Sequence, residues 1–194
     1  MKNLHRVLLL SCATALPLFA LSAAHAETRM TISMAGEAFD GAPAYEVRLG
    51  DRVVASGALA NTVDTLTEGR LFFNPAPEDF IQRVEFSIAD ADFDPAAMVT
   101  ISLTNDKFVQ EGWGRDRNLF VHSVEVNGMV VRAAGLRLMN KGEREKVDYQ
   151  AGFLPVYNKD QTAVAPPPQG GWPLPSNASS ALPSPASEVG KAGG

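Results

Sequence analysis

The order of apolar and polar residues along the chain is that of short β-strands. Apolar and polar side chains alternate across residues 30–34, 45–49 and 84–88. A period of two places one set of side chains on the buried face of a sheet and the other set in solvent. No segment of useful length has the 3.6-residue period of an amphipathic helix. The pattern therefore predicts an all-β protein.

Turn signals separate the predicted strands at short intervals. Gly50 and Asp51 predict one hairpin, and Asn127 and Gly128 predict another, because both residue types tolerate positive φ. The expected strands cover residues 30–34, 45–49, 52–59, 70–74, 82–89, 99–104, 119–126 and 129–133. Many short strands joined by polar turns favour two packed sheets. We therefore expect an antiparallel β-sandwich with a jelly-roll-like architecture.

The strand expected at residues 119–126 changes phase along its length. Under simple alternation its apolar residues before His122 and those after Ser123 fall on opposite faces. The change predicts a β-bulge near these two residues, a feature that redirects side chains close to binding sites. A central strand with both faces buried would give the same pattern.

The N-terminal residues 1–26 have the pattern of a secretory signal. Lys2 and Arg6 begin it, an apolar run follows, and Ala24-His25-Ala26 matches a small-x-small cleavage site. We expect the mature protein to begin at Glu27, to be secreted or periplasmic, and to have no membrane span.

The remaining chain divides into three parts by composition. Residues 27–134 hold the predicted sandwich, and residues 135–157 form an extension that either adds an edge strand or packs on the domain. Residues 158–194 are rich in proline, glycine, serine and alanine, which predicts a disordered tail. Trp172 within this tail either docks on the domain or is free.

Loss of the signal changes the candidate chemistry. The only cysteine, Cys12, leaves with it, so the mature chain has no thiol for a disulfide, a nucleophile or zinc. A single histidine, His122, remains, which is too few for a zinc cluster or a catalytic triad. The full chain has a net charge of −5, and removal of Lys2 and Arg6 makes it more negative. This charge argues against nucleic acid and anionic lipid as partners.

A glycine-rich loop that begins at Asn105 carries the candidate chemistry. Asp106 and Asp116 bracket it, so two carboxylates are held at its two feet, each next to a predicted strand. Such carboxylates repel each other unless a cation lies between them, and calcium binds carboxylate and carbonyl oxygens in flexible geometry. Alternatively, both aspartates are ordinary turn residues that bond to nearby backbone.

The residues around this loop resemble those of a known family. Asn105-Asp106, a loop with glycine and an aromatic residue, and then Asp116-Arg117-Asn118-Leu119 are similar to the signature of the calcium-dependent xylan-binding carbohydrate-binding modules of families 36 and 60. Residues 35–54 are similar to the opening of the same modules. The resemblance covers roughly residues 29–132, with a poorly matching middle.

The resemblance implies a calcium ion with an open side. Asp106, Asp116 and the backbone carbonyl of Arg115 would bind the ion, and two adjacent sugar hydroxyls would fill its remaining positions. The loop is longer than the shorter loops of the family, which leaves open which carbonyls bind and whether Glu111 joins them.

Four residues are expected near the ligand: Glu111, Trp113, Arg117 and Asn118. Trp113 either offers its flat apolar face to a sugar ring or packs beneath the loop. Arg117 is expected to pair with Asp116 or Asp106, and Asn118 to tie the loop backbone to the next strand.

Two other acidic groups are candidate metal sites. Residues 90–94 have Asp-x-Asp-x-Asp spacing but lack the glycine and glutamate that a helix-loop-helix calcium loop needs, so a solvated turn is expected. Glu37 and Asp40 either hold a second, structural calcium or are turn residues.

Three functional classes follow. The leading hypothesis is a secreted, non-catalytic protein that binds xylan or a related polysaccharide through calcium. The alternative is a calcium-stabilised structural or protein-interaction domain of the cell envelope. A glycoside hydrolase needs two carboxylates flanking a cleft, and the sequence singles out no such pair, so we do not expect an enzyme.

Overall fold

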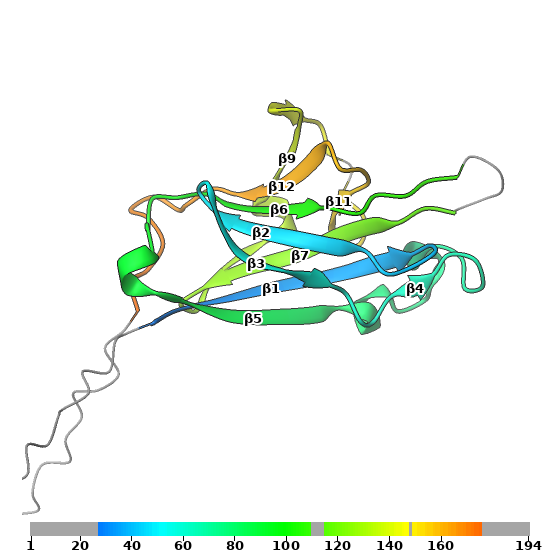
Figure 1. Cartoon of the computed structure of the whole chain (residues 1–194), viewed down its shortest axis with the longest axis horizontal. Helices are drawn as coiled ribbons and strands as arrows, with labels where there is room; N and C mark the ends of the chain where they lie inside the picture. The colour runs from blue at the N-terminus through cyan, green and yellow to red at the C-terminus, as the bar shows by residue number, and fades with distance from the viewer. Residues whose placement is uncertain (1–26, 110–114, 148, 176–194) are drawn as a thin grey trace, which may run out of the picture.

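The computed structural model describes residues 27–109, 115–147 and 149–175. These residues form two six-stranded sheets packed face to face, with short 3-10 helices in the connections (Figure 1). The predicted all-β sandwich is therefore confirmed. In the described part of the chain, no helix has the length and apolar character needed to cross a membrane.

The first sheet is built around two long strands in the order β11-β7-β1-β4. β5 and β4 share one edge of β1, and β8 and β11 share the outer edge of β7. The β1–β4 pair is parallel, whereas the other pairs in this sheet are antiparallel. The strands are β1 (Glu27–Ala38), β4 (Val63–Asp64), β5 (Gln82–Ala89), β7 (Asn118–Val126), β8 (Met129–Arg132) and β11 (Leu154–Val156).

The second sheet is antiparallel, with the order β10-β9-β12-β6-β2-β3. Residues 135–157, expected to extend the domain, supply β9 and β10 here and β11 to the first sheet. The strands are β2 (Ala44–Leu49), β3 (Arg52–Ala58), β6 (Val99–Leu103), β9 (Arg137–Asn140), β10 (Glu143–Glu145) and β12 (Gln161–Ala165).

The position of β12 corrects one prediction. It lies inside the second sheet between β9 and β6, so disorder from residue 158 onward is wrong for this segment. The strand is only five residues long and stands next to a proline-rich stretch. The composition of its neighbours therefore concealed a strand that is stabilised by pairing on both sides.

Trp172 continues the folded chain beyond β12. Its indole is 2% exposed in the main core, where Nε1 donates a hydrogen bond to the Ala97 carbonyl at 2.9 Å. The Trp172 amide donates to Pro95, and Asn127 donates to the Pro173 carbonyl. Of the two alternatives for Trp172, docking on the domain is the one observed. The beginning and the end of the described chain consequently lie at the same end of the sandwich, opposite the feet of the glycine-rich loop (Figure 1).

Residues 70–74 form the 3-10 helix η1 (Leu71–Phe73) rather than the expected strand. Pro75 and Pro77 follow closely, and proline lacks the N–H group that a strand ladder requires. The Leu71 amide donates instead to the buried carboxylate of Glu37 at 2.7 Å. The other 3-10 helices are η2 (Pro77–Phe80), η3 (Asp90–Asp92) and η4 (Ala133–Gly135).

β7 contains the predicted bulge. Ser33 of β1 pairs with Ser123, whereas the next residue, Met34, pairs with Val121, so His122 is the extra residue. The bulge keeps the apolar residues on both sides of it in the core between the sheets. Both predicted hairpins are also present, and Asn127 and Gly128 have φ values of 47° and 85°.

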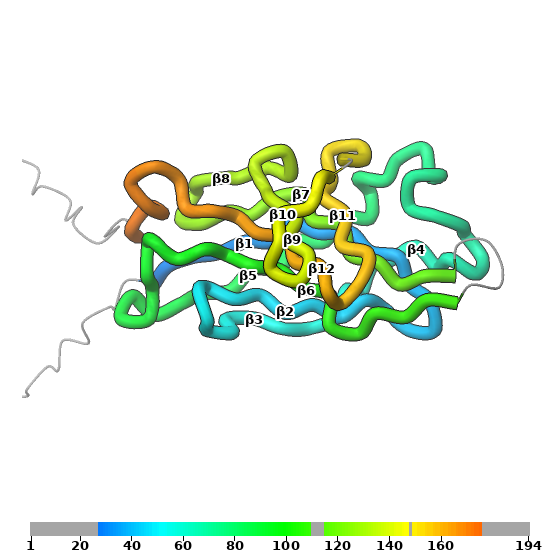
Figure 2. The backbone as a smooth tube through the Cα atoms, turned by 90° about the horizontal axis from the view of Figure 1, so that it is seen from above, coloured from blue at the N-terminus to red at the C-terminus, as the bar shows by residue number. Residues whose placement is uncertain are grey.

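A second, smaller core covers the other face of β1 and β7. Phe72 of η1 packs edge-on against Phe120 of β7, with ring centroids 5.0 Å apart, and against Phe153 at 5.7 Å. Tyr157 packs edge-on against Phe120 from the other side at 6.2 Å. Figure 2 shows residues 64–80 and the feet of the glycine-rich loop at the same end of the molecule. The buried members are Ala35, Val63, Leu71, Phe120 and Phe153.

Candidate functional site

The two feet of the glycine-rich loop are joined by backbone hydrogen bonds. Phe108 and Asp116 form an antiparallel bridge, flanked by a bond from Val109 N to the Arg115 carbonyl (3.0 Å) and one from Arg117 N to Lys107 (2.9 Å). Residues 110–114 lie outside the described chain, and so do the predictions for Glu111 and Trp113. The bridge fixes the backbone from which Asp116 projects.

Asp116 carries a half-buried carboxylate with one buried, unsatisfied oxygen. Its side chain is 14% exposed, and Oδ1 has no hydrogen-bond partner within the described residues. Burial raises the pKa of Asp116, and the negative charge of Asp106 raises it further, against lowering by a hydrogen bond from Asn118 and by the charge of Arg70. The charge of Asp106 thus acts on Asp116, and the role of the two aspartates as calcium ligands stays a prediction.

These groups have the chemistry of a calcium site. A half-buried carboxylate with one buried oxygen that lacks a partner, close to a second negative charge, is stabilised by a divalent cation. The Arg115 carbonyl already accepts one hydrogen bond, and a carbonyl oxygen has a second lone pair. Within the described residues no three His, Cys, Asp or Glu side chains gather as a metal site. Two carboxylates and backbone oxygens thus fit calcium better than a metal that needs nitrogen or sulfur.

Arg117 has a different role from the one predicted. It is 7% exposed and forms no ion pair with Asp106 or Asp116 among those found in the described residues. Its guanidinium lies among the loop backbones, because its five N–H donors can serve several carbonyls at once. The carbonyls that accept from it belong to Phe39, Asp40, Gly41 and Asn105. Arg117 thus fastens the first loop of the chain, residues 39–43 between β1 and β2, to the glycine-rich loop. It does not orient the aspartates.

Asn105 adds a second fastening between the same loops. Its side chain accepts from Ala44 N at 2.7 Å and donates to the Ala42 carbonyl at 2.9 Å. Lys107 pairs with Asp40, and this cation lowers the pKa of Asp40. Asp40 has a φ of 50° at the turn of the first loop, which agrees with a turn role.

Asn118 and Glu37 form a buried polar pair beneath the site. Asn118 is fully buried at the start of β7 and donates to Glu37 Oε2 at 2.7 Å. Glu37 also accepts from Arg70 Nε at 2.9 Å and from Leu71 N at 2.7 Å. Because these donors surround the Glu37 carboxylate, a second calcium at Glu37 and Asp40 does not follow from the geometry. Asn118 ties the loop to the neighbouring strand β1, and its depth argues against direct contact with a ligand.

Comparison with known protein families identifies the family of this chain. The sequence profile of CBM60, the calcium-dependent xylan-binding carbohydrate-binding modules, matches residues 29–138. The chain belongs to this family. The matched region contains both aspartates of the loop and all the strands from β1 to β8. It stops before β10, β11 and β12, so part of each sheet is built from residues outside the match.

Two solved structures of CBM60 modules resemble the chain at low sequence identity. One is the selenomethionine form of vCBM60, from work on circular permutation between two families of calcium-dependent carbohydrate binding modules. It is 12% identical, with a TM-score of 0.38 over 72% of this chain and 90% of that one. The other is vCBM60 in complex with galactobiose, 16% identical, with a TM-score of 0.39 over 71% of this chain and 94% of that one. A comparison with curated proteins gave no significant match.

Sequence reasoning missed a cavity beside Asp116. It has a volume of about 410 Å³, and Arg70 in its wall lies 4.0 Å from Asp116 Oδ2. No spacing rule in the sequence joins its residues, because they come from β1, from η1 and from the segments on either side of β11. They include Glu37, Arg70, Phe72, Phe73, Gln150 and Tyr157.

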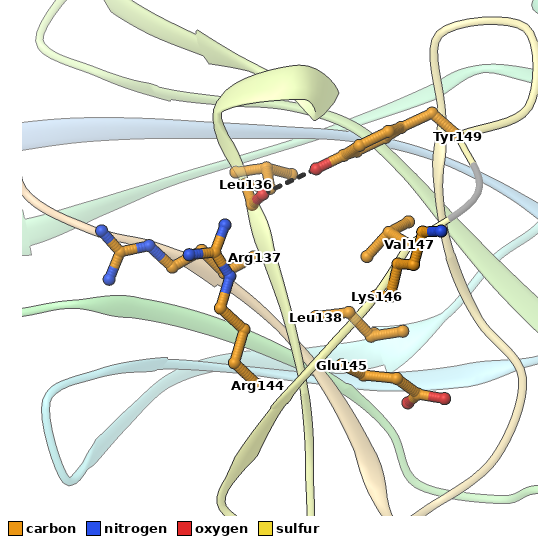
Figure 3. Close-up of a pocket in the computed structure, with 8 residues that line it drawn as sticks. All are labelled: Leu136, Arg137, Leu138, Arg144, Glu145, Lys146, Val147 and Tyr149. Carbon is orange, nitrogen blue, oxygen red and sulfur yellow. Dashed lines mark hydrogen bonds between the residues drawn. The ribbon is translucent and has the colours of Figure 1, made fainter.

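Another cavity lies along β9 and the segment after β10 (Figure 3). Arg137 and Arg144 stand on one side, and Tyr149 donates a hydrogen bond from the other side to the Leu136 carbonyl at 3.0 Å. None of its lining residues belongs to the glycine-rich loop. It is therefore separate from the candidate site around Asp116.

Proposed function

We propose that this protein binds polysaccharide without catalysis, through a calcium ion held by Asp106, Asp116 and the Arg115 carbonyl. The observation that carries the proposal is the buried Oδ1 of the half-buried Asp116 carboxylate, which has no hydrogen-bond partner in the described residues and lies in the field of Asp106. Membership of a family described as calcium-dependent and xylan-binding supports the same conclusion.

Calcium would supply coordination positions for two adjacent hydroxyls of a sugar ring. The chain itself holds the backbone next to the two carboxylates, since Arg117 and Asn105 fasten the glycine-rich loop to the loop between β1 and β2. Such preorganisation reduces the entropy lost on binding. Trp113 and Glu111 complete the proposed ligand contacts from the tip of the loop.

The proposed ligand is xylan or a related glycan with adjacent hydroxyls. The family description names xylan, and one solved CBM60 structure contains galactobiose. A suitable panel therefore includes insoluble xylan, soluble xylooligosaccharides and galactobiose.

We further propose that the protein acts outside the cytoplasm, secreted or periplasmic. The support is the charged start, apolar run and Ala24-His25-Ala26 site of residues 1–26. N-terminal sequencing of protein recovered from the cell envelope or medium tests this, and Glu27 is the expected first residue. A retained residue 1 would contradict it.

The decisive experiment measures retention on insoluble xylan and calorimetric binding of xylohexaose and galactobiose, with calcium and then with EGTA. We expect binding in calcium, none with EGTA, and none for Asp116→Ala. Asp51→Ala, an exposed carboxylate at the β2–β3 hairpin, is the matched control and should bind normally.

Two results would contradict the proposal. Equal binding with calcium and EGTA would remove the metal from recognition. Stabilisation by calcium without binding to any glycan of the panel would favour the alternative, a calcium-stabilised structural or interaction domain of the envelope.

A further inference from the structure

The cavity between η1 and the segments around β11 lies next to Asp116, which approaches the wall residue Arg70 but does not itself line the cavity. Glu37, in its wall, accepts a hydrogen bond from Asn118, two residues after Asp116. Arg70, also in its wall, contacts Glu37 at 2.9 Å and lies 4.0 Å from Asp116 Oδ2. A ligand seated at the aspartates that continues past Arg70 therefore enters this cavity.

The cavity combines aromatic rings with hydrogen-bonding groups. Phe73 is 76% exposed, more than any other large hydrophobic residue in the described chain. Phe72 and Tyr157 lie in the wall as well, and Gln150 Nε2 donates to the Tyr157 hydroxyl at 3.2 Å. A pyranose ring has an apolar C–H face and a polar rim of hydroxyls, so it suits a surface with both kinds of group.

Two rings of the aromatic wall, Phe72 and Tyr157, are held in place before any ligand binds, whereas Phe73 is exposed. Phe72 packs edge-on against Phe120 and Phe153, and Tyr157 packs against Phe120. Arg70 is anchored through Nε on Glu37, while its side chain stays 29% exposed. A surface of fixed rings loses little conformational entropy on binding.

We propose that this cavity is a second sugar subsite, which takes a neighbouring residue of the same polysaccharide chain. Phe73 stacks on the sugar ring, and Arg70 and Gln150 bond to its hydroxyls. This inference rests on the proposed function, because it extends the ligand that the aspartates hold. Gln150 and Tyr157 lie outside the residues matched to CBM60, so the subsite depends partly on the C-terminal segment of this chain.

The test compares affinities for xylobiose, xylotriose, xylotetraose and xylohexaose by calorimetry in calcium. We expect wild-type affinity to rise with chain length. Phe73→Ala should weaken xylohexaose binding about tenfold and leave xylobiose binding unchanged. Phe73→Trp should keep the length dependence, because it restores an aromatic face. Met98→Ala, an exposed apolar residue away from the cavity, is the control and should match wild type.

The outcomes separate this inference from the proposed function. If wild type binds xylobiose in calcium but Phe73→Ala binds every oligosaccharide as tightly as wild type, the subsite is wrong and the calcium site stands. If Phe73→Ala weakens xylobiose and xylohexaose equally, the residue belongs to the primary site and the second subsite is again wrong. If wild type binds none of the oligosaccharides, both the function and the subsite are overturned. Equal melting temperatures for the variants confirm that the differences arise in binding.

Discussion

Two properties of Asp116 are unfavourable for its ionised carboxylate when no cation is bound. It is half-buried, and its buried Oδ1 lacks a hydrogen-bond partner within the described chain. Its raised pKa means that the ionised form is disfavoured in the folded protein, so at neutral pH this carboxylate lowers stability when no cation is bound. A binding site that strains the free protein in this way is a common exchange of stability for function.

Replacement of this charge by an amide should separate stability from metal binding. In EGTA, Asp116→Asn should raise the stability by about 1 kcal/mol, or roughly 2–4 °C in melting temperature. Calcium should raise the melting temperature of wild type but not of the variant. Differential scanning fluorimetry with EGTA or calcium measures both effects, with Asp51→Asn as the control. A variant that calcium still stabilises would remove Asp116 from the metal site.

Replacement of Arg117 should loosen the two loops of the candidate site, although Arg117 itself is not expected to contact a ligand. It donates to four backbone carbonyls of two loops, and a lysine cannot reproduce the fork of a guanidinium. Arg117→Lys should lower the free energy of unfolding by about 2–4 kcal/mol and weaken calcium binding.

Urea denaturation and calcium titration measure the two effects of this change. The exposed Arg132 on β8 gives the control variant Arg132→Lys, which should change neither quantity. Wild-type stability of Arg117→Lys would mean that the guanidinium does not hold the loops together.

At the scale of the element, β7 connects the site to the core. It begins at the buried Asn118, four residues before the bulge at His122, and ends at the hairpin to β8. The bulge lets the residues on both of its sides face the same core, so the strand that starts beneath the site is fixed along its length.

His122 should make the stability of this strand depend on pH. Burial lowers its pKa, and the charge of Arg132 lowers it further. The unfolded chain therefore takes up a proton at a higher pH than the folded protein does. The contribution of His122 is complete above its ordinary value near 6.5 and declines as the pH falls below it.

His122→Phe keeps a ring against Phe153, which lies 5.4 Å from the imidazole, and removes the titration. Because carboxylates also titrate, the informative quantity is the difference in unfolding free energy between variant and wild type at pH 7.5 and pH 5.5. We expect wild type to lose more stability than the variant between these values. An unchanged difference would mean that His122 titrates alike in both states.

The features that sequence predicted well depend on local residue order. The bulge follows from a phase change within one strand, and the two hairpins follow from residue pairs that allow positive φ. The two aspartates were singled out by their positions at the loop feet and by family resemblance, and their role as calcium ligands stays a prediction. The strand β12, the helix η1 and the role of Arg117 depend instead on partners far along the chain. No local pattern indicates that Leu71 N will donate a hydrogen bond to Glu37, or that residues 161–165 will pair with both β9 and β6.

At the scale of the whole molecule, the C-terminal segment completes the sandwich. β12 closes the second sheet, and the buried Trp172 fills the core at the end remote from the loop. A chain ending at residue 157 would leave the inner edges of β9 and β6 unpaired. We expect that chain to lack a cooperative unfolding transition and a chain ending at residue 175 to melt cooperatively.

Circular dichroism during heating distinguishes the two truncated chains. Trp172→Ala in the full chain is the matched variant for the core contact alone, and it should cost about 3–5 kcal/mol. Cooperative melting of the chain that ends at residue 157 would mean that the matched CBM60 region folds without β12.

The start of β1 and Pro173 both contact Asn127, so both ends of the described chain lie at one end of the sandwich, which determines how the protein can be handled as a reagent. Fluorescent labels, affinity tags or a solid support joined close to Glu27 or Pro173 lie at the end of the molecule opposite the aspartates. Under the proposed function, a probe immobilised in this way would present Asp106 and Asp116 outward, and a chelator would release its glycan until calcium is restored.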